Sequence, residues 1–292
     1  MGRRAMSALT AATIMLGVLA GCRGGSDQGA AGEQVRNLTP AEELRISDAE
    51  QLLIKRCMNR AGFRYWTWHV LSAAERRPIG YVQDDVAWAR EHGYGSRIAA
   101  KSEWGRKHNP NGAYRGSLPV ARGKAYDAAL DGGPGTPVLT AEVPGGGTIH
   151  RRAGGCVSEA QKQLYGDLDT WFHADKVADN LRPLYVPEVM RDKRFGEALR
   201  AWSACMRRAG HHHADPGRAR EAATKRGFAT ETEIAAADAA CARETSLKTV
   251  GKAREAYYVE KLTADYGEEL ATHRRLRWEA LARAEKLVGP RR

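Results

Sequence analysis

A short phrase that occurs twice constrains the fold of this chain more than any other feature. Its first copy is Cys57-Met58-Asn59-Arg60-Ala61-Gly62, and its second is Cys205-Met206-Arg207-Arg208-Ala209-Gly210. Each copy follows an apolar run with the three- and four-residue spacing of a helix face. Basic residues fill its last turn, and its glycine suits the left-handed position that ends a helix. The phrase therefore predicts two helices that each carry a core-facing cysteine about one turn before the helix end.

The first residues of the chain predict export and a lipid anchor. Arg3 and Arg4 form a basic start, and the apolar run 8–20 is too short for a membrane-spanning helix. The run ends in Leu19-Ala20-Gly21-Cys22, which resembles the lipobox of bacterial lipoproteins, where cleavage precedes a cysteine that becomes diacylglyceryl-modified. We therefore expect a signal peptide over 1–21, acyl chains such as palmitate on Cys22, and a position on the outer face of the cell membrane. An ordinary secretory signal with a chance cysteine is the alternative.

Four of the five cysteines then remain, and an even number in an exported chain favours disulfides. Three connectivities are possible. Pairing each phrase cysteine with the one that follows it gives Cys57–Cys156 and Cys205–Cys241. Each unit would then close on itself, with the end of one helix tied to the start of a later one, and Glu159 stands three residues past its cysteine as Glu244 does. A zinc site of four cysteines is the competing interpretation, but no Cys-x-x-Cys pair exists to begin it.

The hydrophobic periodicity predicts a mainly α fold that consists of two disulfide-stapled helical units. Residues 22–40 form a glycine-rich tether behind the lipid anchor, residues 41–174 the first unit and residues 175–292 the second. The second unit ends in a long C-terminal helix that reaches residue 288, and its apolar face is expected to pair with the first helix. Two internal glycines, Gly251 and Gly267, are expected to bend this helix.

Two segments predict β-structure, and several capping signals predict helix starts. Residues 137–152 surround a Pro-Gly-Gly-Gly turn and predict a small β-hairpin, while residues 63–68 alternate like a further strand. Thr39-Pro40-Ala41-Glu42 is a capping box with proline at the first helical position, so the first helix should run from about 40 to 61. Further capping boxes begin at Ser72 and Thr230.

The chain is basic, with 46 Lys and Arg against 35 Asp and Glu, a formal net charge of +11 and a pI of about 9.6. Nucleic acid is the usual partner of a basic protein, but we expect none outside the cytoplasm. The membrane, reached through the lipid anchor, and a cell-wall glycan or other anionic envelope polymer are the expected partners. An ordinary solvated surface is the alternative, because many arginines alternate with acids and alanines.

Two clusters have the composition of metal or catalytic sites. His211-His212-His213 with Asp215 offers ligands for zinc, nickel or copper, but adjacent histidines do not converge easily on one ion, and an exposed loop is the better interpretation. Asp84 and Asp85 beside Trp88 have the composition of a paired-carboxylate site for glycan hydrolysis. Adjacent aspartates on a helix point apart, however, and aspartate commonly caps helices. We therefore assign no catalytic residue, no metal ligand and no cofactor.

Aromatic residues are frequent after the first copy of the phrase and offer the best candidate for a ligand surface. The candidate binding residues are Tyr65, Trp66, Trp68, Tyr81 and Trp88. Aromatic rings stack on sugar faces, and arginines nearby recognise anions. Alternating aromatic residues are also typical of a strand that is half buried. Core packing and a ligand groove are therefore both open interpretations of this segment.

Several motifs together are similar to a known group of proteins. The lipobox, the Cys-Met-x-x-x-Gly phrase, Pro78-Ile79-Gly80-Tyr81 with the segment 84–90, and Ala239-Ala240-Cys241 resemble uncharacterised secreted lipoproteins of Streptomyces-type actinobacteria. The resemblance covers most of the mature chain and implies export and anchoring, but it implies no reaction. We predict a binding or structural component of the envelope rather than an enzyme. A cell-wall hydrolase or other envelope enzyme is the alternative.

Overall fold

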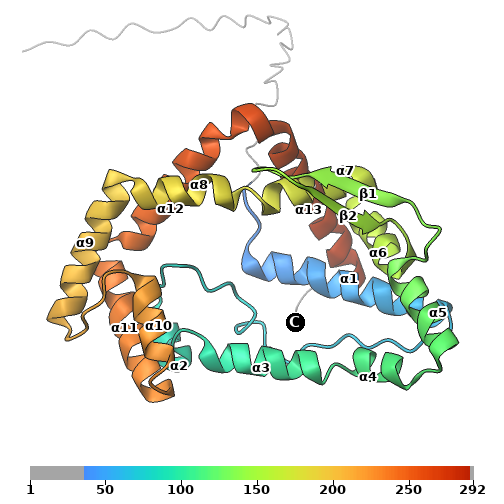
Figure 1. The fold of residues 1–292 in the computed structure, drawn as a ribbon, viewed down its shortest axis with the longest axis horizontal. Coiled ribbons are helices and arrows are strands. Elements are labelled where there is room, and N and C mark those ends of the chain that lie inside the picture. The colour runs from blue at the N-terminus through green and yellow to red at the C-terminus, as the bar shows by residue number, and fades with distance from the viewer. Residues whose placement is uncertain (1–35, 290–292) are drawn as a thin grey trace, which may run out of the picture. The chain divides into compact units, whose positions relative to one another are not determined.

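The computed structural model describes residues 36–289, so the predicted signal peptide, Cys22 and most of the tether lie outside the described residues. The described part is mainly α-helical, as predicted (Figure 1). Its elements are α1 (Pro40–Arg60), α2 (Val86–His92), α3 (Ser96–Lys107), α4 (Pro110–Ser117), α5 (Val120–Asp131), β1 (Val138–Glu142), β2 (Thr148–Arg152), α6 (Gly155–Tyr165), α7 (Leu168–Asp179), α8 (Arg182–Arg191), α9 (Lys193–Arg208), α10 (Pro216–Thr224), α11 (Phe228–Glu244), α12 (Leu247–Lys261) and α13 (Thr263–Val288). Over residues 36–289, none of these helices combines the length and the apolar character needed to cross a bilayer.

Both predicted disulfides are present. The first disulfide joins Cys57 to Cys156, with Cα atoms 5.5 Å apart, and the second disulfide joins Cys205 to Cys241, with Cα atoms 5.6 Å apart. Cys156 lies at the start of α6, as predicted. Cys241 lies in the last turn of α11, so the prediction that it begins a helix is wrong. The alanine-rich segment before Cys241 contains no helix breaker, and α11 therefore runs through it without interruption.

The two copies of the phrase end their helices in the same way. Gly62 and Gly210 have φ angles of +79° and +84°, in the left-handed region where a glycine is not strained. In both copies the amide of the residue after the glycine donates a hydrogen bond to the methionine carbonyl at 2.9 Å. This bond is the signature of a Schellman cap. The expectation that each glycine ends its helix is therefore confirmed.

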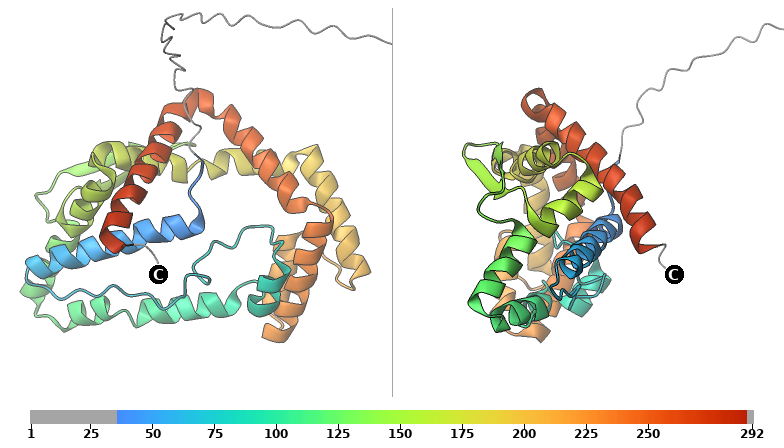
Figure 2. Two further views of the ribbon diagram at one scale, coloured as in Figure 1. Left: turned by 180° about the vertical axis from the view of Figure 1, so that it is seen from behind. Right: turned by 90° about the vertical axis from the view of Figure 1, so that its right-hand side faces the viewer.

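The first disulfide lies in a hydrophobic core shared by α1, α5, α6, α7, the hairpin and the second half of α13. Met58, Leu164 and Ala280 are completely buried there. As expected, the C-terminal helix packs against the first helix, and Figure 2 shows α13 (red) beside α1 (blue). In the hairpin, β1 pairs antiparallel with β2 from Val138↔Arg152 to Glu142↔Thr148, and its inward side chains pack on α7.

The second disulfide lies in a separate core made by α8, α9, α10, α11 and α12. Trp202, Met206 and Leu247 are completely buried in it. Helix α2 also belongs to this core, because it packs along α11. Since α13 belongs to the first core in the same way, each core receives a helix from the other half of the chain.

Residues 63–68 do not form a strand, so that prediction is wrong. The segment is extended, but its backbone is paired with a side chain instead of a neighbouring strand. The Trp66 amide donates to Oδ1 of Asn111 at 2.8 Å, and the Trp66 carbonyl accepts from Nδ2 of Asn111 at 2.8 Å. Because Asn111 lies on α4, this segment is fixed by a helix and has no sheet to join.

The long C-terminal run is divided into α11, α12 and α13, and of the two bends predicted at Gly251 and Gly267, the one at Gly267 is confirmed to within one residue. Helix α11 ends at Glu244, and the next helix begins only after Ser246, which has a φ of +54°. The hydroxyl of Thr245 donates to the Cys241 carbonyl at 2.8 Å, which competes with continuation of the helix. The second interruption is at Leu262, between α12 and α13, and α13 has a further kink at Tyr266, with a φ of −130°, directly before Gly267. Gly251 remains inside the regular helix α12.

The predicted capping boxes have three different outcomes. The box at Thr39 is complete and opens α1. The box at Ser72 forms both of its hydrogen bonds but closes only a turn. The box at Thr230 is wrong, because α11 already begins at Phe228 after Gly227. The acid of this box, Glu233, is exposed on α11, while Glu231 is buried against the start of another helix.

Candidate functional site

A groove of about 470 Å³ lies between α8 and α12 and is the best candidate for a ligand site. The volume is in the range of small-molecule sites. The residues of α8 that line it recur at helical spacing and are Arg182, Tyr185, Val186, Val189 and Met190. The opposite wall is a face of α12 with Lys248, Gly251, Lys252 and Glu255, and the loop 80–82 borders the groove.

The groove is largely apolar, and it collects side chains that proteins usually bury. Met190 is 45% exposed and Tyr81 is 38% exposed, which makes both of them unusually accessible for large apolar residues. Val189 and Phe195 lie deeper and are buried in the second core. The groove is therefore continuous with a rigid interior, and its exposed lining can bury apolar ligand surface.

A glycine keeps the α12 side of the groove open. Gly251 lies inside α12, where glycine is less favourable than alanine by roughly 0.5–1 kcal/mol. A Cβ atom at this position would lie 3.4 Å from Cε2 of Phe195, which leaves room for little more than a methyl group against the core. Any longer side chain at position 251 would have to occupy the groove.

Cations dominate the rim of the groove. Lys248 is paired with Asp84, and Glu255 accepts a hydrogen bond from the Tyr185 hydroxyl at 2.7 Å. Burial, followed by the contact with Glu255, raises the pKa of Tyr185 to about 12, so it donates this bond at neutral pH. Within residues 36–289, Arg182 and Lys252 form no ion pair with a carboxylate. Two lining cations are thus available to a ligand.

The loop beside the groove is held in place from the second core. Arg220 of α10 donates to the Gly80 carbonyl at 2.8 Å, and its guanidinium also lies over the ring of Tyr94. Arg243 of α11 donates to the Asp84 carbonyl at 2.8 Å. Burial, followed by the nearby Asp215 carboxylate, raises the pKa of Tyr81 to about 12. The Tyr81 hydroxyl therefore stays protonated and can act as a hydrogen-bond donor.

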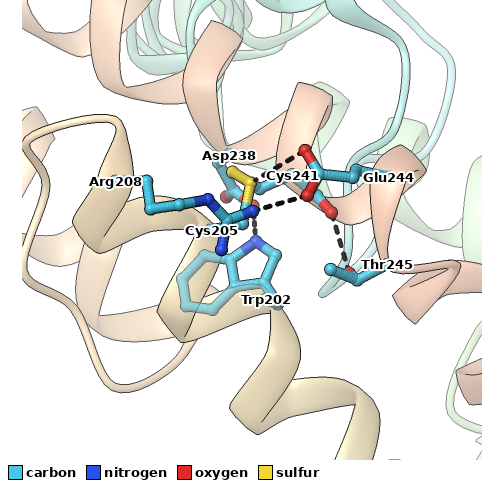
Figure 3. Close-up of a disulfide and its surroundings, with 7 residues drawn as sticks. All are labelled: Trp202, Cys205, Arg208, Asp238, Cys241, Glu244 and Thr245. Atoms are coloured by element: carbon cyan, nitrogen blue, oxygen red, sulfur yellow. Dashed lines mark hydrogen bonds and ion pairs between the residues drawn. A yellow bond between two sulfur atoms is a disulfide. The ribbon is translucent and has the colours of Figure 1, made fainter.

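A buried carboxylate lies at the centre of the second core. Asp238 is 1% exposed and accepts hydrogen bonds from Nε1 of Trp202 at 2.8 Å and from the Tyr94 hydroxyl at 2.9 Å (Figure 3 shows the Trp202 contact). Burial raises the pKa of Asp238 to about 6, and the two donors limit the rise. Desolvation, with the Asp238 charge, also raises the pKa of Tyr94.

A second buried acid ties α11 to the start of α3. Glu231 accepts hydrogen bonds from the Tyr94 amide at 2.8 Å, from the Ser96 amide at 3.1 Å and from the Ser96 hydroxyl. Ser96 is the first residue of α3, so the carboxylate caps this helix where its dipole is positive. Asp238 and Glu231 both therefore have structural partners that account for their burial.

The five aromatic residues predicted to bind a ligand are not brought together. Tyr65 packs at the first core, Trp66 packs edge-on against Tyr114, and Trp88 is buried beside His92. Trp68 lines a different cavity of about 270 Å³, and its Nε1 donates to the Gly105 carbonyl at 3.0 Å. Among the five, Tyr81 is the residue that lines the α8/α12 groove.

The predicted carboxylate and histidine clusters are accounted for by local structure. Asp85 caps α2 by accepting from the Trp88 amide at 3.0 Å, and Asp84 pairs with Lys248 as described above. Asp215 caps α10. Within residues 36–289 no group of three metal-ligating side chains could hold an ion, and the cluster His211–His213 is included in that result.

Sequence reasoning missed the residues that define the groove, which are Arg182, Met190, Gly251 and Lys252. One signal was present in the sequence, because α8 and α12 both carry residues at three- and four-residue spacing that mix cations with apolar side chains. A glycine inside the second of these runs was a further signal, although we interpreted it as a bend. What the sequence does not contain is the pairing of α8 with α12.

Comparison with known proteins gives no relative. No protein-family model, no curated protein and no solved structure matches the chain.

Proposed function

We propose that this chain is a lipid-anchored protein on the outer face of the cell membrane that binds a small ligand in the groove between α8 and α12. The groove itself supports the binding function. It has the volume of a small-molecule site, exposed apolar side chains and two unpaired lining cations among the described residues.

The proposed location is supported by three observations. Residues 1–22 have the pattern of a lipoprotein signal with Cys22 as the lipidated residue, and the motifs quoted above resemble secreted actinobacterial lipoproteins. The two disulfides, which are typical of proteins in oxidising compartments, fit the same location. A lipid anchor would hold the groove near the membrane without a spanning helix.

The binding function can be tested by analysing the molecules that co-purify with the protein. The protein is isolated from its own membranes, washed free of detergent and extracted with organic solvent, and the extract is analysed by mass spectrometry. We expect one class of small molecule in near-stoichiometric amount. We expect it to be absent from Gly251→Leu, where the new side chain must enter the groove. Equal amounts in both proteins would refute the assignment of the site.

Incubation with purified peptidoglycan addresses the cell-wall partner and the enzyme alternative. A polymer-binding component would sediment with the peptidoglycan and leave it intact, whereas a hydrolase would release soluble fragments. The groove proposal predicts neither result, because the surface that the groove exposes is mostly apolar and its volume suits a small ligand rather than a polymer. Fragment release that depends on Asp84 or Asp85 would favour the enzyme.

A further inference from the structure

We propose that the ligand of the α8/α12 groove is a free, single-chain amphiphile with an anionic headgroup, of which a medium-length fatty acid is the simplest example. This inference rests on the proposed function and names the ligand class of the same site. It is carried by two features that occur together, an apolar trough and unpaired cations at its rim.

The trough has the size and chemistry for one aliphatic chain. From Lys248 to Glu255 the α12 wall is about 10 Å long, at 1.5 Å per helical residue. The α8 wall offers Val186, Val189 and Met190 along about 6 Å of this length, and the missing side chain of Gly251 leaves the space between the helices open. The surface that the groove exposes is mostly apolar, which favours a flexible hydrocarbon chain over a polar ligand.

The rim favours a negative headgroup. Three cations and one carboxylate line the groove, and the carboxylate, Glu255, already accepts the Tyr185 hydroxyl. Lys248 is held by Asp84. Arg182 and Lys252 form no ion pair within the described residues, so a ligand carboxylate or phosphate can form charge-assisted hydrogen bonds with them. Tyr81 also lines this edge, while its hydroxyl interacts with the Asp215 carboxylate.

Other occupants fit the groove less well. A sugar needs polar groups along its whole length as well as flat aromatic faces, while most of the surface that this groove exposes is apolar and its charged groups lie at the rim. A bilayer surface requires apolar side chains that protrude, whereas these line a hollow. A helix of another protein would need an open groove, and this one is bordered by the loop 80–82, which Arg220 anchors.

The test compares three ligands with the same ten-carbon chain and different headgroups: decanoate, decanol and decyltrimethylammonium. The protein is the full chain with Cys22→Ser, which carries no acyl chains of its own, and binding is measured by titration calorimetry at low salt. We expect decanoate to bind at least about fivefold more tightly than decanol, since two weak ion pairs are gained, and the cation to bind most weakly. The preference should shrink as the salt concentration rises.

Two variants locate the binding. Gly251→Leu should abolish binding of all three ligands, while Gly116→Leu, at an exposed position of α4 with open space around it, should not change it. The double variant Arg182→Gln and Lys252→Gln should reduce the affinity for decanoate to that for decanol and leave decanol unchanged. Lys124→Gln, an exposed lysine of α5, is its control.

Each alternative result overturns a different part of the idea. Equal affinities for the three ligands, all lost in Gly251→Leu, would overturn the anionic headgroup and leave the apolar groove of the proposed function intact. Binding that survives Gly251→Leu would place the ligand elsewhere and overturn the site. No binding of any ligand, together with binding of the protein to anionic vesicles, would overturn the inference in favour of a membrane surface.

Discussion

Replacing Asp238 by asparagine is expected to remove a loss of folding stability that the second core of the wild type undergoes as the pH rises. The wild-type carboxylate is almost completely buried and has two neutral donors, Trp202 and Tyr94. Asparagine has nearly the same shape, and its oxygen can still accept from Trp202. Its amide group can donate to the Tyr94 oxygen, because a phenol accepts as well as donates. The substitution therefore removes a buried charge and keeps two hydrogen bonds, with the direction of the one to Tyr94 reversed.

The expected magnitude follows from the pKa. Burial raises the pKa of Asp238 from 3.8 to about 6, which corresponds to about 3 kcal/mol between the two protonation states. The folded state binds this proton more tightly than the unfolded state. The stabilisation is therefore complete below pH 3.8 and is lost as the pH rises through about 6. The variant has no such loss, so its stability relative to the wild type should increase by about 2 kcal/mol between pH 4 and pH 7.5, the remainder being lost below pH 4.

The assay is urea denaturation of both proteins at closely spaced pH values, because the difference between them isolates the one group. Asp169→Asn, at an exposed position of α7, controls for the substitution itself. Asp238→Ala should instead cost about 2 kcal/mol or more at every pH, since it leaves the Trp202 and Tyr94 donors without an acceptor. If the stability curves of Asp238→Asn and the wild type run parallel from pH 4 to pH 7.5, the reasoning is refuted.

Three further predictions concern the anchor, the disulfides and the helix caps. Cys22→Ser should move the protein from the membrane to the medium or leave its precursor uncut, and a cleaved variant that still requires detergent for extraction would contradict the lipid anchor. Removing the first disulfide, which closes 99 residues, should cost about 5 kcal/mol, and removing the second, which closes 36, about 4, as measured by urea denaturation of each double alanine variant. Gly210→Ala should cost about 1–2 kcal/mol in the same assay, because φ is +84° and no neighbour is near the new Cβ. Gly116→Ala should cost nothing, which makes it the matched control.

The parts of the fold that were predictable are those that short-range chemistry determines. The capping box at Thr39, the glycine caps and the turn of the hairpin each depend on residues within one or two turns of the chain. The disulfides were predictable for another reason, because the repeated phrase pairs each cysteine with its own unit. In the caps and the turn, both partners of the interaction lie close together in the sequence. In the disulfides, the repetition of the phrase indicates the partners.

The parts that were not predictable depend on partners distant in the sequence. Residues 63–68 have the alternation of a strand, but the side chain of Asn111 satisfies the backbone instead. Thr230-Glu231-Thr232-Glu233 has the pattern of a capping box for its own helix, but Glu231 caps α3, which begins 135 residues earlier. The groove also depends on partners distant in the sequence, since neither α8 nor α12 indicates from its own sequence which helix it will face.

The two halves of the chain repeat one arrangement, and the difference between them is informative. Beside the first disulfide an oxygen of Glu159 lies 3.3 Å from the Cys57 sulfur, and beside the second an oxygen of Glu244 lies 3.4 Å from the Cys205 sulfur. Each glutamate also forms an ion pair with the arginine three residues after that cysteine. These pairs are Arg60–Glu159 and Arg208–Glu244, the second of which is drawn in Figure 3.

In the second half, α9 and α11 remain in contact one turn before their disulfide cysteines, where Trp202 donates a hydrogen bond to Asp238. The corresponding positions in the first half are Ile54 and Ala153, which cannot form this bond. Helix α6 begins only at Gly155, so the first half has no helical turn at that level and fills it with apolar packing. The disulfide with its Arg–Glu pair is therefore common to both halves, and the buried polar contact and the α8/α12 groove are both features of the second core.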